Sequence, residues 1–308
     1  MNLKFLETFL WVARLKSFSA AADKLNITQA AVSARIASLE DELGVRLFER
    51  EGRSVQLTSH GIKAQERAQT IVSLVRNFVA EVSNPESQRG TLRLGVIDTI
   101  SLSWLVELID MARLRYPNVR FELYVDTSLA INDMLLRNEL DIGLLMGPVI
   151  GQNILNLELC RYRCSWVASP VYGLGGRPVT IRELAAHPII SFPAGSKPHA
   201  WLARLLLAAG AETPLVFESN SLATKVRLAR DGIGVAALPT VLIEEEAAAK
   251  GLEILDVTPD FPPLLVHASY VDDGHSILPG SIAMMAVEVA ANYVDKKKNF
   301  MEKAGNPT

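Results

Sequence analysis

Two polar side chains near the start of the chain could recognise a partner by direct hydrogen bonding. Gln29 and Ser33 stand four residues apart on a segment predicted to be helical, so both lie on one face of that helix. Thr28 precedes them as a good N-cap, because its hydroxyl group can accept a hydrogen bond from a free N–H of the first turn. Amide and hydroxyl groups near the N-terminal end of an exposed helix are suited to hydrogen-bonding the edges of DNA bases.

The rest of this helix separates an apolar face from a face of small residues. Val32, Ile36 and Leu39 follow the i, i+4, i+7 spacing and predict the buried face. The opposite face consists of Ala30, Ser33, Ala34, Ala37 and Ser38. Such a face fits either the floor of a DNA major groove or close packing against another helix, and both interpretations stay open here. Arg35 lies beside the apolar face, and we expect it to reach a DNA phosphate rather than a base.

Turn and strand patterns flank this helix on both sides. A short helix and a tight turn precede it over residues 19–27, and Gly44 can end it in a left-handed conformation. Two short strands over residues 47–57 then enclose a turn that contains a glycine. This pattern predicts a wing with Arg50 and Arg53 at its tip, where guanidinium groups can contact phosphates or enter a narrow minor groove. A solvated charge on a turn is the alternative for each arginine.

These motifs resemble those of the LysR-type transcriptional regulators. The resemblance extends more loosely over nearly the whole chain and is carried, in this order, by residues 6–9, 17–40, 39–44, 47–50 and 57–61. It implies DNA contacts by Gln29, Ser33 and Arg53. The chain departs from the family pattern at Ala30 and Ala34, where many members have Pro and Arg. We expect the DNA-binding surface to comprise Thr28, Gln29, Ala30, Ser33, Ala34, Arg35, Arg50 and Arg53.

The segment after the wing reads as one long helix with an apolar seam. Its valines and one alanine repeat at spacings of four and three, a heptad pattern that Ile71 and Phe78 widen. The seam consists of Ala68, Val72, Val75, Val79 and Val82. Pro85 breaks the helix within a polar linker over residues 83–88. The pattern predicts an exposed helix that pairs with a second copy of the chain, with packing on its own domain as the alternative.

Apolar strand-like runs alternate with helical ones from Gly90 onward, which predicts an α/β region with a largely parallel sheet. The fold class is therefore α/β, with an N-terminal winged helix-turn-helix, a long linker helix and, by the resemblance, a two-lobed effector domain similar to periplasmic binding proteins. We expect domains at 1–58, 59–88 and 89–308. Within the last, lobe I comprises 90–168 and 267–308, and lobe II comprises 169–266, with crossings near residues 168–170 and 262–263.

Polar residues gather where predicted strands give way to helices, the place at which open α/β sheets bind ligands. Helix N-termini there offer free N–H groups to anions, although simple N-capping is an alternative for each pair. By the resemblance, the effector cleft includes the strand end at Phe192. The expected effector-binding residues are Thr99, Ser101, Thr127, Ser128, Phe192, Asn220 and Ser221. They favour a small organic acid, but the Asp98 carboxylate would disfavour an anion unless it points away.

Composition and missing signatures exclude several classes of protein. The 308 residues are 49% hydrophobic and 21% charged, as in globular proteins, and the net charge of −3 requires that any DNA binding be local. Glu7 and Arg14 argue against a secretory signal. Cys160 and Cys164 read as reduced thiols on one strand. We find no catalytic motif and no metal-ligand spacing, and expect neither cofactor nor metal.

The expected function is that of a cytoplasmic transcription factor controlled by a small-molecule effector. Its partners would be double-stranded DNA with two-fold related half-sites, the effector and a second copy of the chain. The resemblance further implies a homotetramer, and contact with RNA polymerase is left open. No membrane partner is expected, because no apolar run approaches 18 residues. The alternative is a solute-binding protein or an α/β enzyme that carries an unrelated helical N-terminus.

Overall fold

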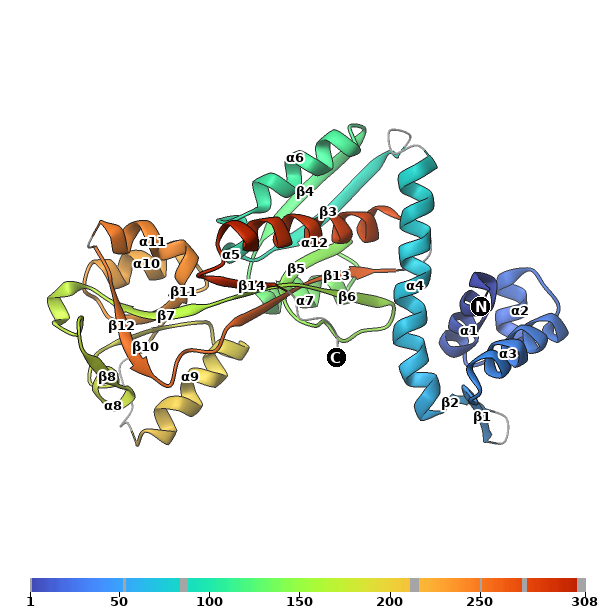
Figure 1. Ribbon diagram of the computed structural model, residues 1–308, viewed down its shortest axis with the longest axis horizontal. Coiled ribbons are helices and arrows are strands. Elements are labelled where there is room, and N and C mark those ends of the chain that lie inside the picture. Colours follow the sequence, from blue (N-terminus) through green and yellow to red (C-terminus); the bar gives the residue numbers. More distant parts are fainter. Residues whose placement is uncertain are drawn as a thin grey trace. The chain divides into compact units, whose positions relative to one another are not determined.

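The structure of the protein is a computed structural model that describes residues 2–51, 54–83, 88–210, 216–249, 251–272 and 276–303. The chain divides into two compact units, Met1–Asn84 and Pro85–Thr308. The first unit holds the predicted helix-turn-helix, the hairpin and the long helix, and the second holds two mixed sheets with their covering helices (Figure 1). The long helix thus shares a unit with the DNA-binding elements rather than standing as a domain of its own.

The N-terminal unit is built as the sequence predicts around helix α3. Its elements are α1 (Leu3–Leu15), α2 (Phe18–Leu25), α3 (Gln29–Leu43), β1 (Phe48–Glu51), β2 (Ser54–Leu57) and α4 (Ser59–Ser83). Gly44 ends α3 with a φ of 67°, which confirms the predicted left-handed cap. Val32, Ile36 and Leu39 are at most 3% exposed and form a core with α1. Helix α2 begins one residue earlier than predicted, because the hydroxyl of Ser17 accepts from the Ala20 N–H.

A buried carboxylate that the sequence did not reveal holds α3 to the hairpin. Glu40 Oε1 accepts hydrogen bonds from the backbone N–H groups of Leu47, at 2.7 Å, and Phe48, at 3.2 Å. Its other oxygen accepts from the guanidinium group of Arg46 at 3.2 Å. Because the Glu40 side chain is only 8% exposed, these charge-assisted bonds fix where the wing leaves the helix.

Helix α4 divides the predicted seam between two environments. Ala68 and Val72 are 3% and 2% exposed and belong to the core of their own unit, where α4 packs on α1. For these two residues the prediction of pairing with a second copy is wrong, because α1 already covers them. Further along the helix, apolar side chains are exposed, namely Ile71, Leu74, Phe78 and Val79. We call these four the α4 strip. Val75 is half-buried, and the side chain of Val82 lies outside the described residues.

The C-terminal unit contains two six-stranded sheets, one in each lobe (Figure 1). The lobe I sheet has the order β14-β6-β13-β5-β3-β4, with β3 (Gly90–Val96), β4 (Val119–Val125), β5 (Ile142–Met146), β6 (Ile154–Tyr162), β13 (Leu264–Val271) and β14 (Met301–Lys303). The lobe II sheet has the order β10-β9-β11-β7-β12-β8, with β7 (Cys164–Ala168), β8 (Pro178–Thr180), β9 (Ile189–Ser191), β10 (Val216–Glu218), β11 (Val235–Pro239) and β12 (Glu253–Thr258).

Helices cover both sheets and carry the strand-end residues. They are α5 (Asp98–Ser101), α6 (Leu105–Arg115), α7 (Ser128–Leu136), α8 (Ile181–Leu184), α9 (Lys197–Ala208), α10 (Leu222–Arg230), α11 (Thr240–Ala248) and α12 (Leu278–Lys296), with a short 3-10 helix at Pro170–Tyr172. Helix α7 approaches the lobe I sheet closely. A Cβ atom at Gly143 would lie 2.7 Å from the side chain of Ile131, and one at Gly95 would lie 3.0 Å from it, so these two glycines allow the helix that opens at the predicted pocket to lie this close.

The chain crosses between the lobes earlier than predicted. Strands β6 and β7 are separated by Arg163 alone, yet β7 pairs with β11 and β12 of lobe II. The first crossing is therefore at Arg163 rather than at 168–170, because one apolar run spans both strands and conceals it. The return, after β12 ends at Thr258 and before β13 begins at Leu264, agrees with the prediction. Lobe I thus carries residues 90–162 and 264–303, and lobe II carries 164–258.

Both sheets are mixed, so the prediction of a largely parallel sheet is wrong. In lobe I, β3 is parallel to β4 and β5, whereas β13 is antiparallel to β5 and β6. In lobe II, β7 is antiparallel to β11 and β12. The antiparallel pairs involve the crossing strands, because a chain that leaves a lobe and returns to it must run in both directions.

The two cysteines lie on different strands, on either side of the first crossing. Both thiols are buried and free, which agrees with the prediction of reduced cysteines but not with their placement on one strand. Burial raises the pKa of each thiol to about 12. Both are therefore protonated near neutral pH and are poor nucleophiles.

Candidate functional site

Helix α3 offers the exposed small face that the sequence predicts. Thr28 accepts a hydrogen bond from the Ala31 N–H at 3.2 Å, as expected for the N-cap. Gln29 is exposed at the start of the helix and Ser33 is half-buried one turn later. The remaining small residues of this face are all exposed, namely Ala30, Ala34, Ala37 and Ser38. Within the unit, this face is not the one that packs on α1, and its DNA contacts stay predictions.

Arg35 has a structural contact that the sequence did not indicate. Its guanidinium Nη1 donates a hydrogen bond to the Thr8 hydroxyl at 3.2 Å, and that hydroxyl donates to the Lys4 carbonyl oxygen at 2.7 Å. Because Thr8 is fully buried on α1, this chain of hydrogen bonds fixes α3 relative to α1. The predicted phosphate contact of Arg35 stays a prediction, alongside this role within the unit.

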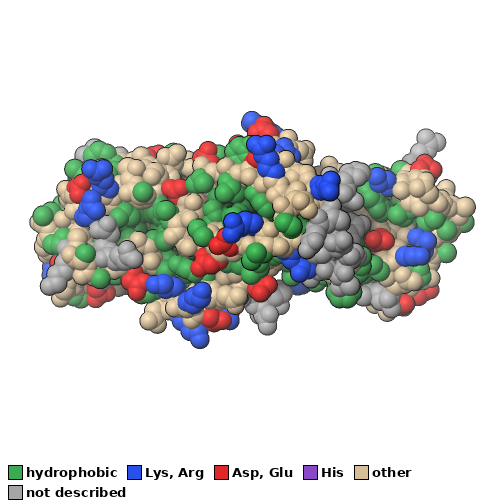
Figure 2. Space-filling model, turned by 90° about the horizontal axis from the view of Figure 1, so that it is seen from above, with side chains coloured by type: hydrophobic (Ala, Val, Ile, Leu, Met, Phe, Trp, Pro, Cys, Tyr) green, Lys and Arg blue, Asp and Glu red, His purple; other side chains and the backbone are tan. Residues whose placement is uncertain are grey.

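The hairpin has the form of the predicted wing. Strands β1 and β2 pair antiparallel, with Arg50 opposite Val55. The side chain of Arg50, and Arg53 as a whole, lie outside the described residues. Their DNA contacts stay predictions. Over the face that Figure 2 shows, acidic, basic and apolar side chains are interspersed rather than gathered by charge, in keeping with a net charge of only −3.

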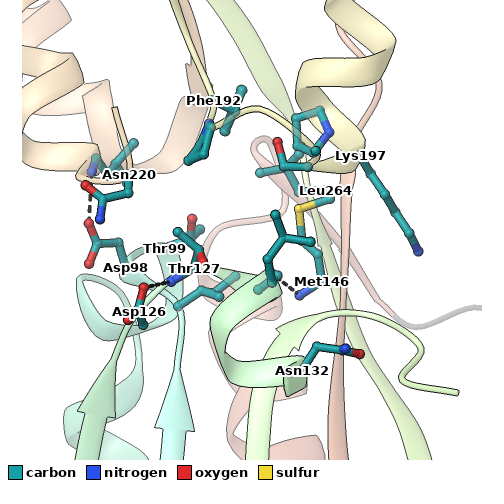
Figure 3. A pocket seen from close by; sticks show the side chains of 18 of the residues that line it. Asp98, Thr99, Asp126, Thr127, Asn132, Met146, Phe192, Lys197, Asn220 and Leu264 are labelled. Atoms are coloured by element: carbon teal, nitrogen blue, oxygen red, sulfur yellow. Dashed lines mark hydrogen bonds between the residues drawn. The ribbon is translucent and has the colours of Figure 1, made fainter. Parts of the chain in front are cut away.

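A cavity of about 320 Å³ lies between the two lobes. Five of the seven predicted effector residues line it, namely Thr99, Thr127, Ser128, Phe192 and Asn220. In Figure 3, Thr99, Thr127 and Met146 of lobe I face Phe192 and Asn220 of lobe II across the opening. The three lobe I residues lie at or just after the ends of β3, β4 and β5, and the two lobe II residues lie in the loops after β9 and β10. The expectation that ligands bind where strands give way to helices therefore located the cavity.

The other two predicted residues do not line the cavity. Ser101 is the last residue of α5, because that helix begins at Asp98 and a separate helix, α6, follows it. The predicted helix N-terminus at Ser101 is therefore wrong. Ser221 caps α10 by accepting from the Thr224 N–H at 3.3 Å, which is the alternative of simple N-capping. Ser128 lines the cavity, but its hydroxyl accepts from the Met146 N–H at 3.0 Å.

The N-terminus of α10 already holds a carboxylate of the protein. Asp98 Oδ2 accepts a hydrogen bond from the Leu222 N–H at 2.9 Å, between lobe I and lobe II (Figure 3). Asp98 also lines the cavity, so it does not point away from it. The prediction that this terminus is open to an effector anion is therefore wrong in the structure described.

Sequence reasoning missed Lys225, a buried lysine in the cavity wall. The residue is only 4% exposed, and its Nζ lies 3.8 Å from the ring centroid of Phe192. Burial lowers its pKa from 10.5 to about 8, although Cys164 and Asp98 act in the opposite direction. A signal was present in the sequence. Leu222, Lys225 and Ala229 follow the i, i+3, i+7 spacing of the buried face of α10, so the lysine occupies a position typical of an apolar residue.

The described residues hold neither a metal-binding cluster nor a membrane-spanning helix. Within them, no three His, Cys, Asp or Glu side chains are grouped so that they could hold a metal ion. None of the described helices combines the length and the apolar character that crossing a bilayer requires.

Comparison with known proteins identifies both units. Residues 3–62 match the family described as bacterial regulatory helix-turn-helix protein, lysR family, and residues 85–276 match the LysR substrate binding domain. The first match is inconsistent with the alternative of an unrelated helical N-terminus.

Curated relatives match this chain along most of their own length. The transcriptional regulator BenM of Acinetobacter baylyi is 27% identical over 94% of this chain and 91% of its own. BbuR of Bordetella bronchiseptica is 30% identical over 84% of this chain and 80% of its own.

A solved structure supports the fold as a whole. Oxidised OxyR of Corynebacterium glutamicum matches with a TM-score of 0.59 and 21% identity, covering 98% of this chain and 96% of that one. The predicted fold class is thus confirmed. It combines a winged helix-turn-helix, a long helix and a two-lobed domain. The chain belongs to the LysR-type transcriptional regulators and is a DNA-binding regulator with a substrate-binding effector domain.

Proposed function

We propose that this regulator controls a promoter through α3 and the wing, and that a small molecule bound between the lobes of the C-terminal unit adjusts this control. The observation that carries the proposal is the cavity of about 320 Å³, which is lined by residues of both lobes. Its size is at the lower end of the range for small-molecule sites. A ligand there contacts both lobes at once, so its binding is coupled to the angle between them.

The proposed DNA contacts divide by role. Gln29 and Ser33 read base edges from the start of α3, and the exposed Ala30 and Ala34 allow this helix to approach the groove floor closely. Thr28 lies beside them at the N-terminus of the helix, where backbone N–H groups favour a phosphate. Three arginines, Arg35, Arg50 and Arg53, supply positive charge to the phosphate backbone.

The proposed assembly is a homodimer paired through the α4 strip, and a homotetramer through further contacts between effector domains. Four exposed apolar side chains along one helix support pairing with a second copy. Such a dimer presents two α3 helices to half-sites that are related by two-fold symmetry. We place the protein in the cytoplasm, where its DNA target is, and leave contact with RNA polymerase open.

Protection of promoter DNA tests this function directly. The full chain is mixed with the intergenic DNA beside its own gene, and footprints are recorded with and without a library of small metabolites. We expect two protected half-sites about one helical turn, or a whole number of turns, apart, whose protection or spacing changes with one class of compound. Thermal shift identifies the compounds, because a ligand that binds only the folded state raises the melting temperature.

Two matched variants distinguish an effect on the cavity from an effect on the rest of the C-terminal unit. Thr99→Val removes a hydroxyl from the cavity wall, while Ser269→Ala removes one that bonds Asn156 away from the cavity. Only the first should alter the response to the compound. The proposal fails if the footprint never responds to a compound that binds the protein, or if no specific footprint forms.

A further inference from the structure

Lys225 is a cation buried in the wall of the effector cavity, and no described residue accepts a hydrogen bond from its ammonium group. Among the described residues its Nζ has no hydrogen-bond partner, and its contact is with the face of the Phe192 ring. Only 4% of the residue is exposed. Burying an ammonium group without a hydrogen-bonded anion is costly, so a position like this persists where something else compensates it.

The charged and titratable neighbours of Lys225 supply only part of that compensation. The Asp98 carboxylate, on α5, acts on the Lys225 pKa only through space, and its Oδ2 accepts a hydrogen bond from the Leu222 N–H. Cys164, on β7, is a neutral thiol near neutral pH because burial raises its pKa to about 12. The ring of Phe192 offers only a cation–π contact, which is weaker than pairing with an anion. The ammonium group therefore keeps donors available towards the cavity that it lines.

We propose that Lys225 determines the specificity of the effector cavity, and that the effector is a small monoanionic acid whose acid group binds the Lys225 ammonium group. This inference rests on the proposed function, in which the cavity binds an effector. The remainder of the effector is apolar. Apolar atoms make up most of the surface that lines the cavity, and Leu129, Met146, Phe192 and Leu264 are among the side chains that supply them.

The same wall disfavours a second acid group on the effector. Two carboxylates, Asp98 and Asp126, lie in it and oppose any anion. The Lys225 ammonium group offsets this repulsion for one acid group but not for a second. The other lysine in the lining, Lys197, donates to the Gly147 carbonyl oxygen at 2.9 Å, and its side chain runs away from the centre of the cavity in Figure 3. The Lys225 ammonium group is thus available to pair with one acid group of the effector. The cavity volume of about 320 Å³ limits the apolar part of the effector to a chain or ring of modest size.

The test measures binding of matched probes to the full chain by calorimetry. The probes are hexanoate and phenylacetate, their neutral amides hexanamide and phenylacetamide, and the dianion adipate. We expect at least one monoanion to bind, and its amide and adipate to bind at least tenfold more weakly. Lys225→Met should weaken the monoanion to the level of its amide. Lys296→Met, which removes an exposed lysine outside the lining, should leave the affinity within about threefold.

A measurement on the unaltered chain guards against a folding defect in the variant. Affinity for the monoanion should fall as the pH is raised above about 8, where the buried amine loses its proton while the acid stays ionised. The inference is overturned if no monoanion binds, if amides bind as well as acids, or if Lys225→Met, still folded by circular dichroism, binds the acid normally.

The outcomes also separate this inference from the proposed function. If acids bind through Lys225 but never alter the promoter footprint, the chemistry of the cavity stands and the proposed function fails. If a neutral compound alters the footprint equally in the wild type and in Lys225→Met, the proposed function stands and the inference about Lys225 is wrong.

Discussion

The carboxylate of Asp98 and the backbone N–H of Leu222 form a 2.9 Å hydrogen bond that joins the two lobes beside the effector cavity. Asp98 opens α5 in lobe I, and Leu222 is the first residue of α10 in lobe II. A carboxylate at this place is stabilised both by the hydrogen bond and by the positive end of the helix dipole. The protein thus holds its lobes together with an anion of its own.

Asp98→Ala should destabilise the C-terminal unit because it removes this bond between the lobes. A charged N-terminal contact of this kind contributes about 1–2 kcal/mol. For a unit of this size that corresponds to a fall in melting temperature of about 2–8 °C, measured by calorimetry on the full chain. Asp126→Ala is the control, because the exposed Asp126 carboxylate bonds only its neighbour Thr127 among the described residues. Equal melting temperatures for Asp98→Ala and Asp126→Ala would show that the bond does not hold the lobes.

The features that local chemistry determines could be predicted from the sequence, and those that depend on distant partners could not. The Thr28 cap, the Gly44 cap and the buried face of α3 follow from spacing alone. The contact between Asp98 and Leu222 joins positions 124 residues apart, and no periodicity reveals it. On α4 the spacing showed which face is apolar, but not that α1 covers Val72.

Lys225→Met should make the unliganded protein more stable near neutral pH. Because burial lowers the lysine pKa from 10.5 to about 8, the unfolded chain holds this proton more tightly than the folded one. The wild type therefore gains stability as pH rises from about 8 towards 10.5, by about 3 kcal/mol at about 1.4 kcal/mol per pH unit. The variant lacks this gain. Unfolding by urea at pH 7 and at pH 10 should show its advantage shrinking with pH, and a constant difference would contradict the prediction.

Gln29→Ala and Ser33→Ala should each weaken binding to the specific promoter site by about 1–3 kcal/mol and relax discrimination at one base pair. Ser38→Ala is the control, since this exposed serine lies on the same face further from the N-terminus. Gel shift with single-base variants of the site measures both effects. Unchanged affinity and base preference for Gln29→Ala would show that α3 does not read bases through its N-terminal end.

The arginines should respond differently from the two polar residues. Arg53→Ala should weaken specific and non-specific DNA to a similar extent and reduce the salt dependence of binding by about one phosphate contact. Arg35→Ala carries an added structural cost, because its guanidinium group bonds Thr8 at 3.2 Å. Thr8→Val removes that bond and keeps the charge, so comparing the two variants isolates the DNA contribution of Arg35. If Thr8→Val loses as much DNA affinity as Arg35→Ala, then Arg35 acts by positioning α3.

Two substitutions by aspartate in helix α4 distinguish an effect on dimerisation from an effect on folding. Phe78 is 63% exposed in the α4 strip, whereas Val72, about two turns earlier, is 2% exposed in the core of its own unit. In a fragment of residues 1–84, which has its own core, Phe78→Asp should give folded monomers, because it places a charge at the seam between copies. Val72→Asp should instead unfold the fragment by burying an unpaired charge. Sedimentation and circular dichroism distinguish these results. A dimeric Phe78→Asp fragment would show that copies of the N-terminal unit do not pair through the α4 strip.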